Sequence, residues 1–267
     1  MAGVAVLGVT GRMGRSILPL IASSDDLTLT GALASAGNPA VGVEAGDGVA
    51  AGRTGVIVTD DVERALDGAD VAIDFTRPGA SVLHAETCAR RPCPIVIGTT
   101  GLDAAARSAI EAASRAIPIV LAPNMSLGVA VMMKLAHLAA GALPRQYDAE
   151  IFEAHHRGKV DAPSGTALAL GEAVAEARGT RLTDSAVYSR TGDTGARPDG
   201  AIGFSVLRAG DIVGEHRLVL AGPGERLEVL HVAHDRAAFA RGALAAARWL
   251  VAGRRPGVYG MHDVLGL

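Results

Sequence analysis

Two adjacent histidines, a lysine and a helix start lie within one short stretch near the middle of the 267-residue chain. The stretch runs from Glu153 to Thr166 and contains His155, His156 and Lys159. Imidazole and ammonium groups hold carboxylates and exchange protons near neutral pH. These residue types at this spacing predict a cationic pocket that binds an anionic substrate and delivers protons to it. The alternative is a solvated basic loop between a strand and a helix.

The residues on either side predict the elements that position this cluster. Ile151 and Phe152 lead into it with a strand-like apolar pattern, whereas Pro163 and Ser164 stand where a helix begins. Backbone N–H groups at a helix N-terminus attract anions. We therefore expect the histidine and lysine nitrogens to converge near such a terminus.

Composition narrows the class of protein. Hydrophobic residues make up 49% of the chain but aromatic residues only 3%, so the core must consist of Ala, Val, Leu and Ile. The net charge of −3 gives no global attraction to nucleic acid or to an anionic membrane, and we expect neither as a partner. Cys88 and Cys93, the only cysteines, form neither a disulfide framework nor a zinc spacing.

The first residues predict a strand and no secretion signal. Met1 to Gly3 lead directly into the apolar run 4–7, which predicts a cytoplasmic protein. One uncharged run, residues 116–133, approaches the length of a membrane span. Pro118 and Pro123 interrupt it, so a strand, a turn and a helix start are expected there.

A glycine-rich turn follows the first strand. Gly8, Gly11 and Gly14 stand between strand 4–9 and an apolar helix that starts at Ser16, in a variant of the dinucleotide-binding spacing. An ordinary strand-to-helix turn is the alternative. The second strand, 27–33, ends in Ala34-Ser35 and lacks the acid that usually binds the ribose hydroxyls. Arg12 is a candidate basic residue for the 2′-phosphate of NADPH. The sequence therefore predicts NADH, NADPH or both as the cofactor.

Strands and helices alternate in the first half of the chain. Strands are expected at 56–58, 71–75, 94–97 and 117–121, with helices between them. This order predicts an α/β fold with a Rossmann-like, doubly wound parallel sheet, in which ligands bind beyond the carboxyl ends of the strands. The turns at Gly8, Thr76, Gly98 and Pro123 would share that edge.

Strand patterns succeed one another in the second half. They cover 149–152, 186–189, 202–207, 213–220 and 227–232, and one helix, 164–178, interrupts them. This predicts a second, α+β domain with a mixed or antiparallel sheet, residues 127–235. Residues 1–126 and 236–267 would form the dinucleotide-binding domain, with a hinge at the two crossings. The basic loop 190–198 could fold over an anionic ligand, but a solvated hairpin or a subunit contact is favoured. His231 and His234 are predicted to be structural.

Several motifs together resemble one enzyme family, 4-hydroxy-tetrahydrodipicolinate (dihydrodipicolinate) reductase of lysine and diaminopimelate biosynthesis. The resemblance spans essentially the whole chain and rests most on Glu153 to Ala167. The other matching segments are 8–15, 74–78, 98–101, 122–126, 202–204, 210–216 and 263–265.

This resemblance implies a nicotinamide-dependent reductase that uses NADH, NADPH or both and forms a homotetramer through its second domain. His155 would be the proton donor and acceptor, and Lys159 a proton donor. The substrate is a small dicarboxylate, and the residues implied to hold it are His156, Lys159, Gly165 and Thr166. The residues implied to bind the cofactor are Gly8, Val9, Thr10, Gly11, Arg12, Met13, Ser35, Gly98, Thr99, Thr100, Ala122, Pro123, Asn124 and Met125. Ala34 and Ser35 depart from the acid and base found in many members.

Three rival functions are weighed against this one. Another two-domain dehydrogenase would not need the Ser-Gly-Thr helix start after two histidines. A non-catalytic dinucleotide sensor would not need the histidine and lysine cluster. A metal hydrolase would have to use His155, His156 and Asp161, but adjacent residues of a strand point to opposite faces, so no metal is predicted.

Overall fold

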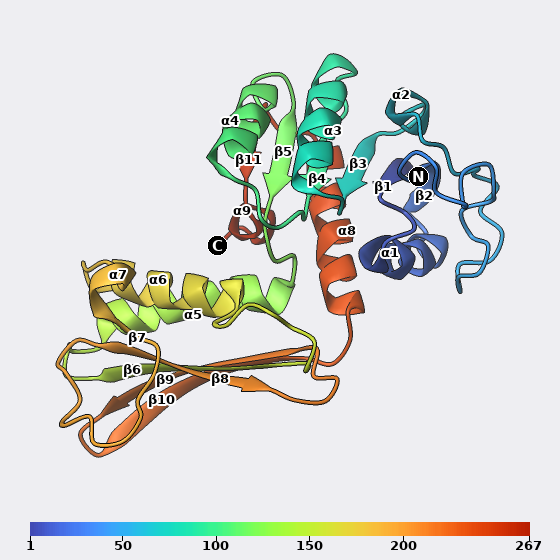
Figure 1. Ribbon diagram of the computed structural model, residues 1–267. Helices are drawn as coiled ribbons and strands as arrows, with labels where there is room; N and C mark the ends of the chain where they lie inside the picture. The colour runs from blue at the N-terminus through green and yellow to red at the C-terminus, as the bar shows by residue number, and fades with distance from the viewer. The chain divides into compact units, whose positions relative to one another are not determined.

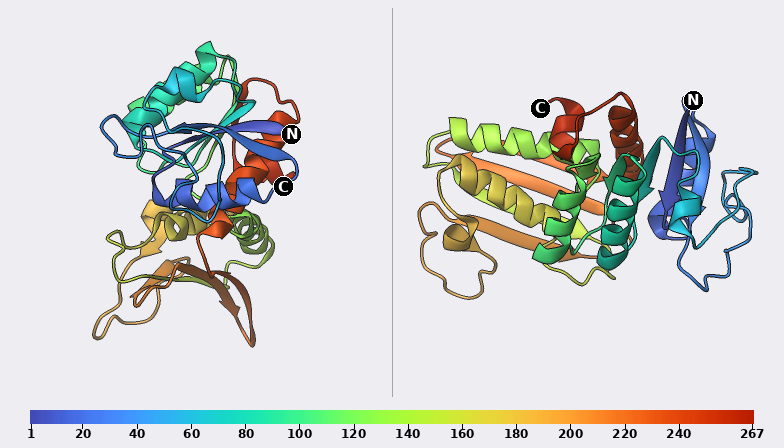
Figure 2. Two further views of the ribbon diagram at one scale, coloured as in Figure 1. Left: turned by 90° about the vertical axis from the view of Figure 1, so that its right-hand side faces the viewer. Right: turned by 90° about the horizontal axis from the view of Figure 1, so that it is seen from above.

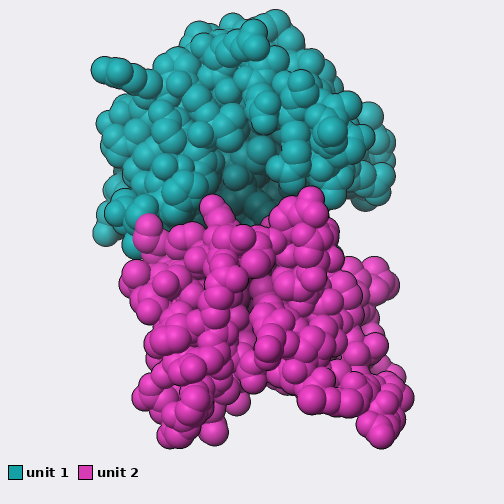
Figure 3. Space-filling model, turned by 90° about the vertical axis from the view of Figure 1, so that its left-hand side faces the viewer, with its two compact units in different colours: residues 1–127, 236–267 teal, residues 128–235 magenta.

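The computed structural model describes all residues from Met1 to Leu267. The chain divides into two compact units, distinguished by colour in Figure 3. Unit 1 consists of Met1–Leu127 and Arg236–Leu267, and unit 2 consists of Gly128–Asp235. Each unit has its own sheet and its own core.

Unit 1 contains a six-stranded parallel sheet with the order β11-β5-β4-β3-β1-β2 (Figure 1). Its strands are β1 Ala2–Leu7, β2 Leu27–Leu33, β3 Val71–Asp74, β4 Ile95–Ile97, β5 Pro118–Leu121 and β11 Gly257–Tyr259. The central strands are mostly apolar runs, buried except for half-buried Ala2, and Asp74 at the end of β3 is their one charged residue. Such runs are expected where helices cover both faces of a parallel sheet.

Two pairs of helices cover the faces of this sheet (Figure 2). Helices α1 (Arg12–Ala22) and α8 (Ala237–Val251) contact each other, as do α3 (Pro78–Arg90) and α4 (Ala104–Ala113). Short helices α2 (Val62–Ala65) and α9 (Met261–Leu265) complete the unit. Because helices lie on both faces, the predicted doubly wound sheet is confirmed.

Unit 2 contains a five-stranded mixed sheet with the order β10-β9-β6-β8-β7. Its strands are β6 Asp148–His155, β7 Ala186–Val187, β8 Ile202–Arg208, β9 Gly214–Gly222 and β10 Glu225–Ala233. Strand β6 runs parallel to β8 and antiparallel to β9. Helices α5 (Leu127–Ala142) and α6 (Gly165–Ala177) cover one face of the sheet, and α7 (Leu182–Ser185) follows them (Figure 1). The predicted α+β unit with a mixed sheet is confirmed.

The structure departs from the sequence expectations at four places. The helix expected from Ser16 begins at Arg12, so Gly14 lies inside α1. Residues 56–58 form no strand, because Val56 and Val58 exchange backbone hydrogen bonds with the turn at 42–45 instead of joining the sheet. The strand expected at 186–189 contains only Ala186 and Val187. The sixth strand of unit 1, β11, was not expected; its three residues are too few to show an alternating pattern.

Candidate active site

The glycine turn of unit 1 is shaped by close backbone contacts. Gly8 has a φ of 87°, and the N–H groups of Gly8 and Val9 both donate to the Leu33 carbonyl at 2.9 Å. A Cβ at Gly14 would lie 2.5 Å from the carbonyl oxygens of Gly8 and Val9, so only glycine lets α1 approach the turn. Gly11 precedes α1 and provides no side-chain cap, which leaves the N–H groups of the first turn for an anion such as a pyrophosphate.

A buried polar network joins the ends of β3 and β4. Asp74 accepts hydrogen bonds from the backbone N–H and the hydroxyl of Thr76, at 2.8 and 2.6 Å. Ser81 donates to the Thr99 hydroxyl at 2.7 Å. A Cβ at Gly98 would lie 2.1 Å from the Phe75 ring. The turn 98–100 is therefore fixed against the preceding strand end, at the sheet edge where such folds bind ligands.

The end of β2 carries no carboxylate. Ala34 is buried, Ser35 is exposed, and the Asn38 amide donates to the Thr10 hydroxyl at 3.3 Å. This contact and the Leu33 carbonyl bonds place residues 34–38 against the glycine turn. A nicotinamide dinucleotide fits these residues, because the turn offers N–H groups for its pyrophosphate and the end of β2 holds no charge that would repel a 2′-phosphate.

In unit 2, the carboxylate of Glu153 is the centre of a buried cluster. Its side chain is only 1% exposed, yet both of its oxygens have polar partners. Arg208 donates to both oxygens, at 2.7 and 2.8 Å, and the Ser164 N–H donates at 3.0 Å. His155 Nδ1 lies 2.5 Å from Glu153 Oε2. Two residues apart on β6, Glu153 and His155 share one face of the strand, and Arg208 of β8 pairs with His155 in register.

Two histidine rings pack together in this cluster. The rings of His155 and His216 are T-shaped, with centroids 5.2 Å apart. Burial lowers the pKa of His155 below its ordinary value, although Glu153 opposes the shift. Burial also lowers the pKa of His216, to about 4, so His216 is neutral at pH 7. The His216 Nε2 lies 3.2 Å from the Ser164 hydroxyl.

The turn after β6 places a lysine before the start of α6. Lys159 Nζ lies 2.8 Å from Asp161 Oδ1, and Arg208 donates to the Asp161 carbonyl at 2.6 Å. Ser164 is the N-cap of α6, and its hydroxyl accepts from the Ala167 N–H at 3.2 Å. Gly165 and Thr166 form the first turn of the helix, as expected. His156 follows β6, and its side chain forms no hydrogen bond or ion pair.

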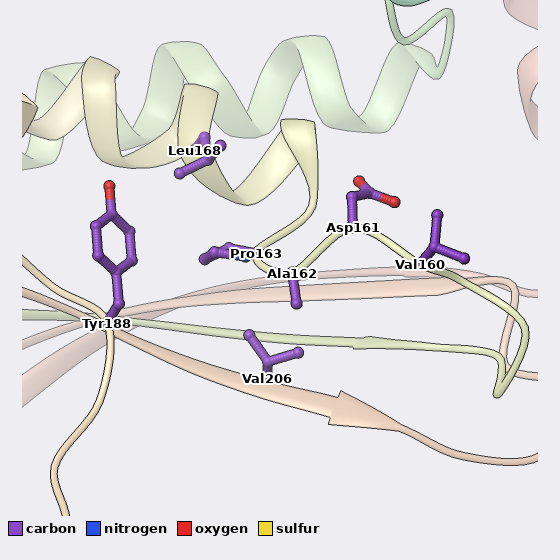
Figure 4. A pocket seen from close by; sticks show the side chains of 7 residues that line it. All are labelled: Val160, Asp161, Ala162, Pro163, Leu168, Tyr188 and Val206. Carbon is purple, nitrogen blue, oxygen red and sulfur yellow. The ribbon is translucent and has the colours of Figure 1, made fainter.

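A cavity of about 840 Å³ lies beside this cluster, between residues 160–163, α6 and β8 (Figure 4). Side chains that point into the same space include Leu168, Tyr188 and Val206 (Figure 4). Asp161 is the only charged residue in the lining. A mostly apolar cavity with one carboxylate is a poor match for an anionic substrate, so we do not assign the substrate to it.

Sequence reasoning did not assign roles to Glu153, Arg208 or His216. Glu153 and His216 lay inside matched segments, and the spacing of Glu153 from His155 was the available signal, because residues i and i+2 of a strand share a face. The contact of Arg208 with Glu153 depends on the pairing of β6 with β8, which local sequence does not reveal. No group of three or more His, Cys, Asp or Glu side chains is placed to hold a metal ion.

Comparison with known proteins agrees with the motifs. Two family models match, "Dihydrodipicolinate reductase, N-terminus" over residues 2–125 and "Dihydrodipicolinate reductase, C-terminus" over residues 128–265. The 4-hydroxy-tetrahydrodipicolinate reductase of Thiobacillus denitrificans is 55% identical over 264 residues, 99% of this chain and 98% of the relative. The chain belongs to the dihydrodipicolinate reductase family.

Further relatives of this dihydrodipicolinate reductase family support the assignment. The 4-hydroxy-tetrahydrodipicolinate reductase of Alkalilimnicola ehrlichii is 52% identical over 99% of this chain and 98% of the relative. The dipicolinate-bound dihydrodipicolinate reductase of Paenisporosarcina sp. TG-14 is 26% identical, covers 98% of each chain and has a TM-score of 0.78. The predicted family, its NAD(P)H-dependent reductase function and its nicotinamide cofactor are confirmed. No helix is long and apolar enough to cross a membrane.

Proposed function

We propose that the chain transfers a hydride from NADH or NADPH to the substrate for which its relatives are named, 4-hydroxy-tetrahydrodipicolinate, and so produces tetrahydrodipicolinate for lysine and diaminopimelate synthesis. The observation that carries this proposal is the Glu153–His155 pair, which precedes Lys159 and the N-terminus of α6 on one short segment. Hydride transfer to a conjugated imine builds negative charge, which a proton must neutralise. The cofactor supplies the hydride, and this segment supplies protons and anion binding.

His155 is the proposed proton donor and acceptor, and Lys159 the proposed second donor. His155 is 12% exposed, so its ring is anchored yet reachable. Lys134 and Lys159 are the only lysines among 25 basic residues of the Lys and Arg type. Arginine stays protonated in proteins, whereas a lysine ammonium can release a proton. The lysine at position 159 therefore supports a role in proton transfer.

The substrate carboxylates are proposed to bind His156, Lys159, Gly165 and Thr166. The N–H groups of the first turn of α6 and the side chain of Lys159 offer positive charge and directed donors. The dipicolinate bound to the Paenisporosarcina relative supports a small dicarboxylate.

The cofactor is proposed to bind unit 1. The residues concerned are those of the glycine turn, the end of β2 and the turns after β4 and β5: 8–13, Ser35, 98–100 and 122–125. Residues 1–126 with 236–267 would be the dinucleotide-binding domain, and 127–235 the domain for substrate and self-association.

Self-association is proposed to use the sheet face of unit 2 that α5 and α6 leave uncovered (Figure 1). Leu207, Leu230 and Val232 are 40–50% exposed there, and Phe152 and Val219 lie on the same face by strand alternation. We propose a homotetramer located in the cytoplasm. Light scattering that gave the mass of a single chain would contradict the assembly.

The function is tested by following NADH and NADPH absorbance with substrate made from pyruvate and aspartate semialdehyde by the preceding synthase. Substrate-dependent oxidation is expected. His155→Gln and Lys159→Met should each lower kcat by about 10²- to 10⁴-fold, the usual contribution of a positioned acid or base. Exposed His234→Gln and Lys134→Met are the matched controls and should keep turnover. Near wild-type kcat in both site variants would refute these roles.

A further inference from the structure

The contacts of Glu153 determine its charge. Its Oε1 accepts from Arg208 Nη2 and the Ser164 N–H, and its Oε2 accepts from Arg208 Nη1. Burial opposes ionisation, but the hydrogen bonds from Arg208, His155 and the Ser164 N–H outweigh it and hold the pKa of Glu153 below its usual value. Glu153 is therefore an ionised carboxylate, which only accepts hydrogen bonds.

The charge of Glu153 decides which nitrogen of His155 carries a proton. His155 Nδ1 lies 2.5 Å from Glu153 Oε2, so Nδ1 must be the donor in this pair. We propose that Glu153, clamped by Arg208, is the positioning residue that fixes the Nδ1–H tautomer of His155 and leaves Nε2 to exchange the proton with the substrate. This inference rests on the proposed role of His155 and adds Glu153 and Arg208 to it.

The space next to Nε2 fits this assignment. Position 214 on β9 is glycine, and a Cβ there would lie 3.2 Å from His155 Nε2 and 3.5 Å from its Cδ2. Any larger side chain would cover the nitrogen on that side. With glycine at this position, no side chain of residue 214 covers Nε2, whereas Nδ1 is engaged by Glu153.

Arg208 connects the two proposed proton donors. Besides its two bonds to Glu153, Arg208 donates to the carbonyl of Asp161 at 2.6 Å, and Asp161 pairs with Lys159. A bidentate guanidinium holds a carboxylate in one orientation, which a lysine ammonium does not. Arg208 therefore orients Glu153, and through it His155, while it also ties down the turn that carries Lys159.

The groups that face His155 come from three strands and one turn. Glu153 of β6 is negative, Arg208 of β8 and Lys159 are positive, His216 of β9 is neutral, and Asp161 pairs with Lys159. Burial, Lys159 and Arg208 lower the pKa of His155, and Glu153 alone raises it. Loss of the Glu153 charge must therefore lower that pKa further and move the alkaline limb of the pH–rate profile to lower pH.

The decisive variant is Glu153→Gln. Its amide oxygen is expected to face the fixed Ser164 N–H, since His155 can exchange its tautomer but a backbone N–H cannot. The NH₂ group then replaces Oε2, so Arg208 Nη1 loses its acceptor, and the NH₂ group donates to His155 Nδ1, which forces the proton to Nε2. Turnover should fall by about 10²-fold or more, as when a histidine base is held in the wrong tautomer.

Glu150→Gln is the matched control. Glu150 lies on the same strand and is likewise held by a bidentate arginine, Arg190 at 2.8 and 2.9 Å, with Arg197 as a second arginine at 3.0 Å. Three residues from Glu153, its side chain lies on the opposite face of the sheet. Glu150→Gln removes a comparable ion pair without contact to His155. In a variant whose oligomeric assembly is verified, the tautomer of His155, the pH profile and kcat should therefore stay unchanged.

The readouts are solid-state ¹⁵N spectra of histidine-labelled protein, with His155 assigned by subtraction of His155→Gln, and pH–rate profiles. Wild-type protein should show protonated Nδ1 and bare Nε2 in the neutral ring, and Glu153→Gln the reverse. Proton on Nε2 in wild type overturns the inference even when the variant fails to fold. An unchanged pH profile in folded Glu153→Gln also overturns it. Full turnover in His155→Gln would refute the proposed role of His155, and wild-type protein that oxidises neither NADH nor NADPH with substrate would refute the proposed function, which keeps these failures distinct.

Discussion

No preference between NADH and NADPH is predicted for the natural chain, and Ser35→Asp should make it prefer NADH. Ser35 is exposed directly after β2, whose last carbonyl receives the N–H groups of Gly8 and Val9. An aspartate there would accept hydrogen bonds from the ribose hydroxyls of NADH, the usual role of an acid at the end of this strand. The same carboxylate would repel the 2′-phosphate of NADPH.

The size of the repulsion follows from the exposure of Ser35. Two unit charges about 4 Å apart interact by about 1 kcal/mol in a water-like medium, the appropriate limit for an exposed side chain. The 2′-phosphate carries close to two charges at pH 7, which gives about 2 kcal/mol. That energy corresponds to a loss of about 30-fold in NADPH affinity. NADH should bind equally well or a few-fold more tightly.

Dissociation constants for both cofactors, measured by calorimetry without substrate, test this reasoning. Ser189→Asp, an exposed serine in unit 2, carries the same added charge and should change neither constant. The loss for NADPH should shrink at 1 M salt, because salt screens exposed charges. Equal loss for both cofactors, or none for NADPH, would show that Ser35 does not face the ribose.

Two further predictions concern packing and pH. Gly14→Ala should weaken cofactor binding and lower the free energy of unfolding by about 1–3 kcal/mol, because its Cβ would lie 2.5 Å from the Gly8 and Val9 carbonyl oxygens. Gly79→Ala is the control: a Cβ there has no neighbour within 4 Å, so thermal unfolding should be unchanged. Burial lowers the pKa of His216 from 6.5 to about 4, so the unfolded chain binds this proton first as pH falls. Stability should therefore drop by about 3 kcal/mol between pH 6.5 and 4. His216→Gln should lack that component in urea titrations at the two pH values, and an identical pH dependence would contradict the assignment.

The parts of the fold that follow from local sequence were predictable. The strand at 4–7, the turn with Gly8 and Gly11, and the helix α1, which contains Gly14, form a unit whose pattern lies within about twenty residues. The start of α6 at Ser164 was equally local, because a serine N-cap satisfies backbone donors of its own helix. Prediction failed where residues distant in sequence determine the secondary structure. Val56 and Val58 have strand-forming side chains, but their backbone groups form hydrogen bonds with the turn at 42–45 instead of a sheet strand.

The candidate site likewise has residues that the sequence alone indicates and residues whose role depends on the fold. His155 and Lys159 could be found because their residue types carry the chemistry wherever they lie. The partner that orients His155 was hidden in part, since Glu153 is near in sequence but its charge depends on Arg208, 55 residues later. A buried carboxylate without that arginine would carry a raised pKa and could then donate to His155 instead of accepting from it. The register of β6 with β8 therefore fixes the direction of the hydrogen bond between Glu153 and His155, the proposed proton donor and acceptor.

The use of basic residues supports this division of roles. Where a cation must hold a carboxylate in one orientation, at Glu150 and Glu153, the chain has arginines, whose planar groups bind both oxygens. Only two positions carry lysine, and one of them is 159, beside the proposed substrate-binding helix start. An arginine at 159 would still attract a carboxylate but could not release a proton. Lys159→Arg should therefore retain affinity for dipicolinate while kcat falls, and a parallel loss of both would indicate that Lys159 serves binding alone.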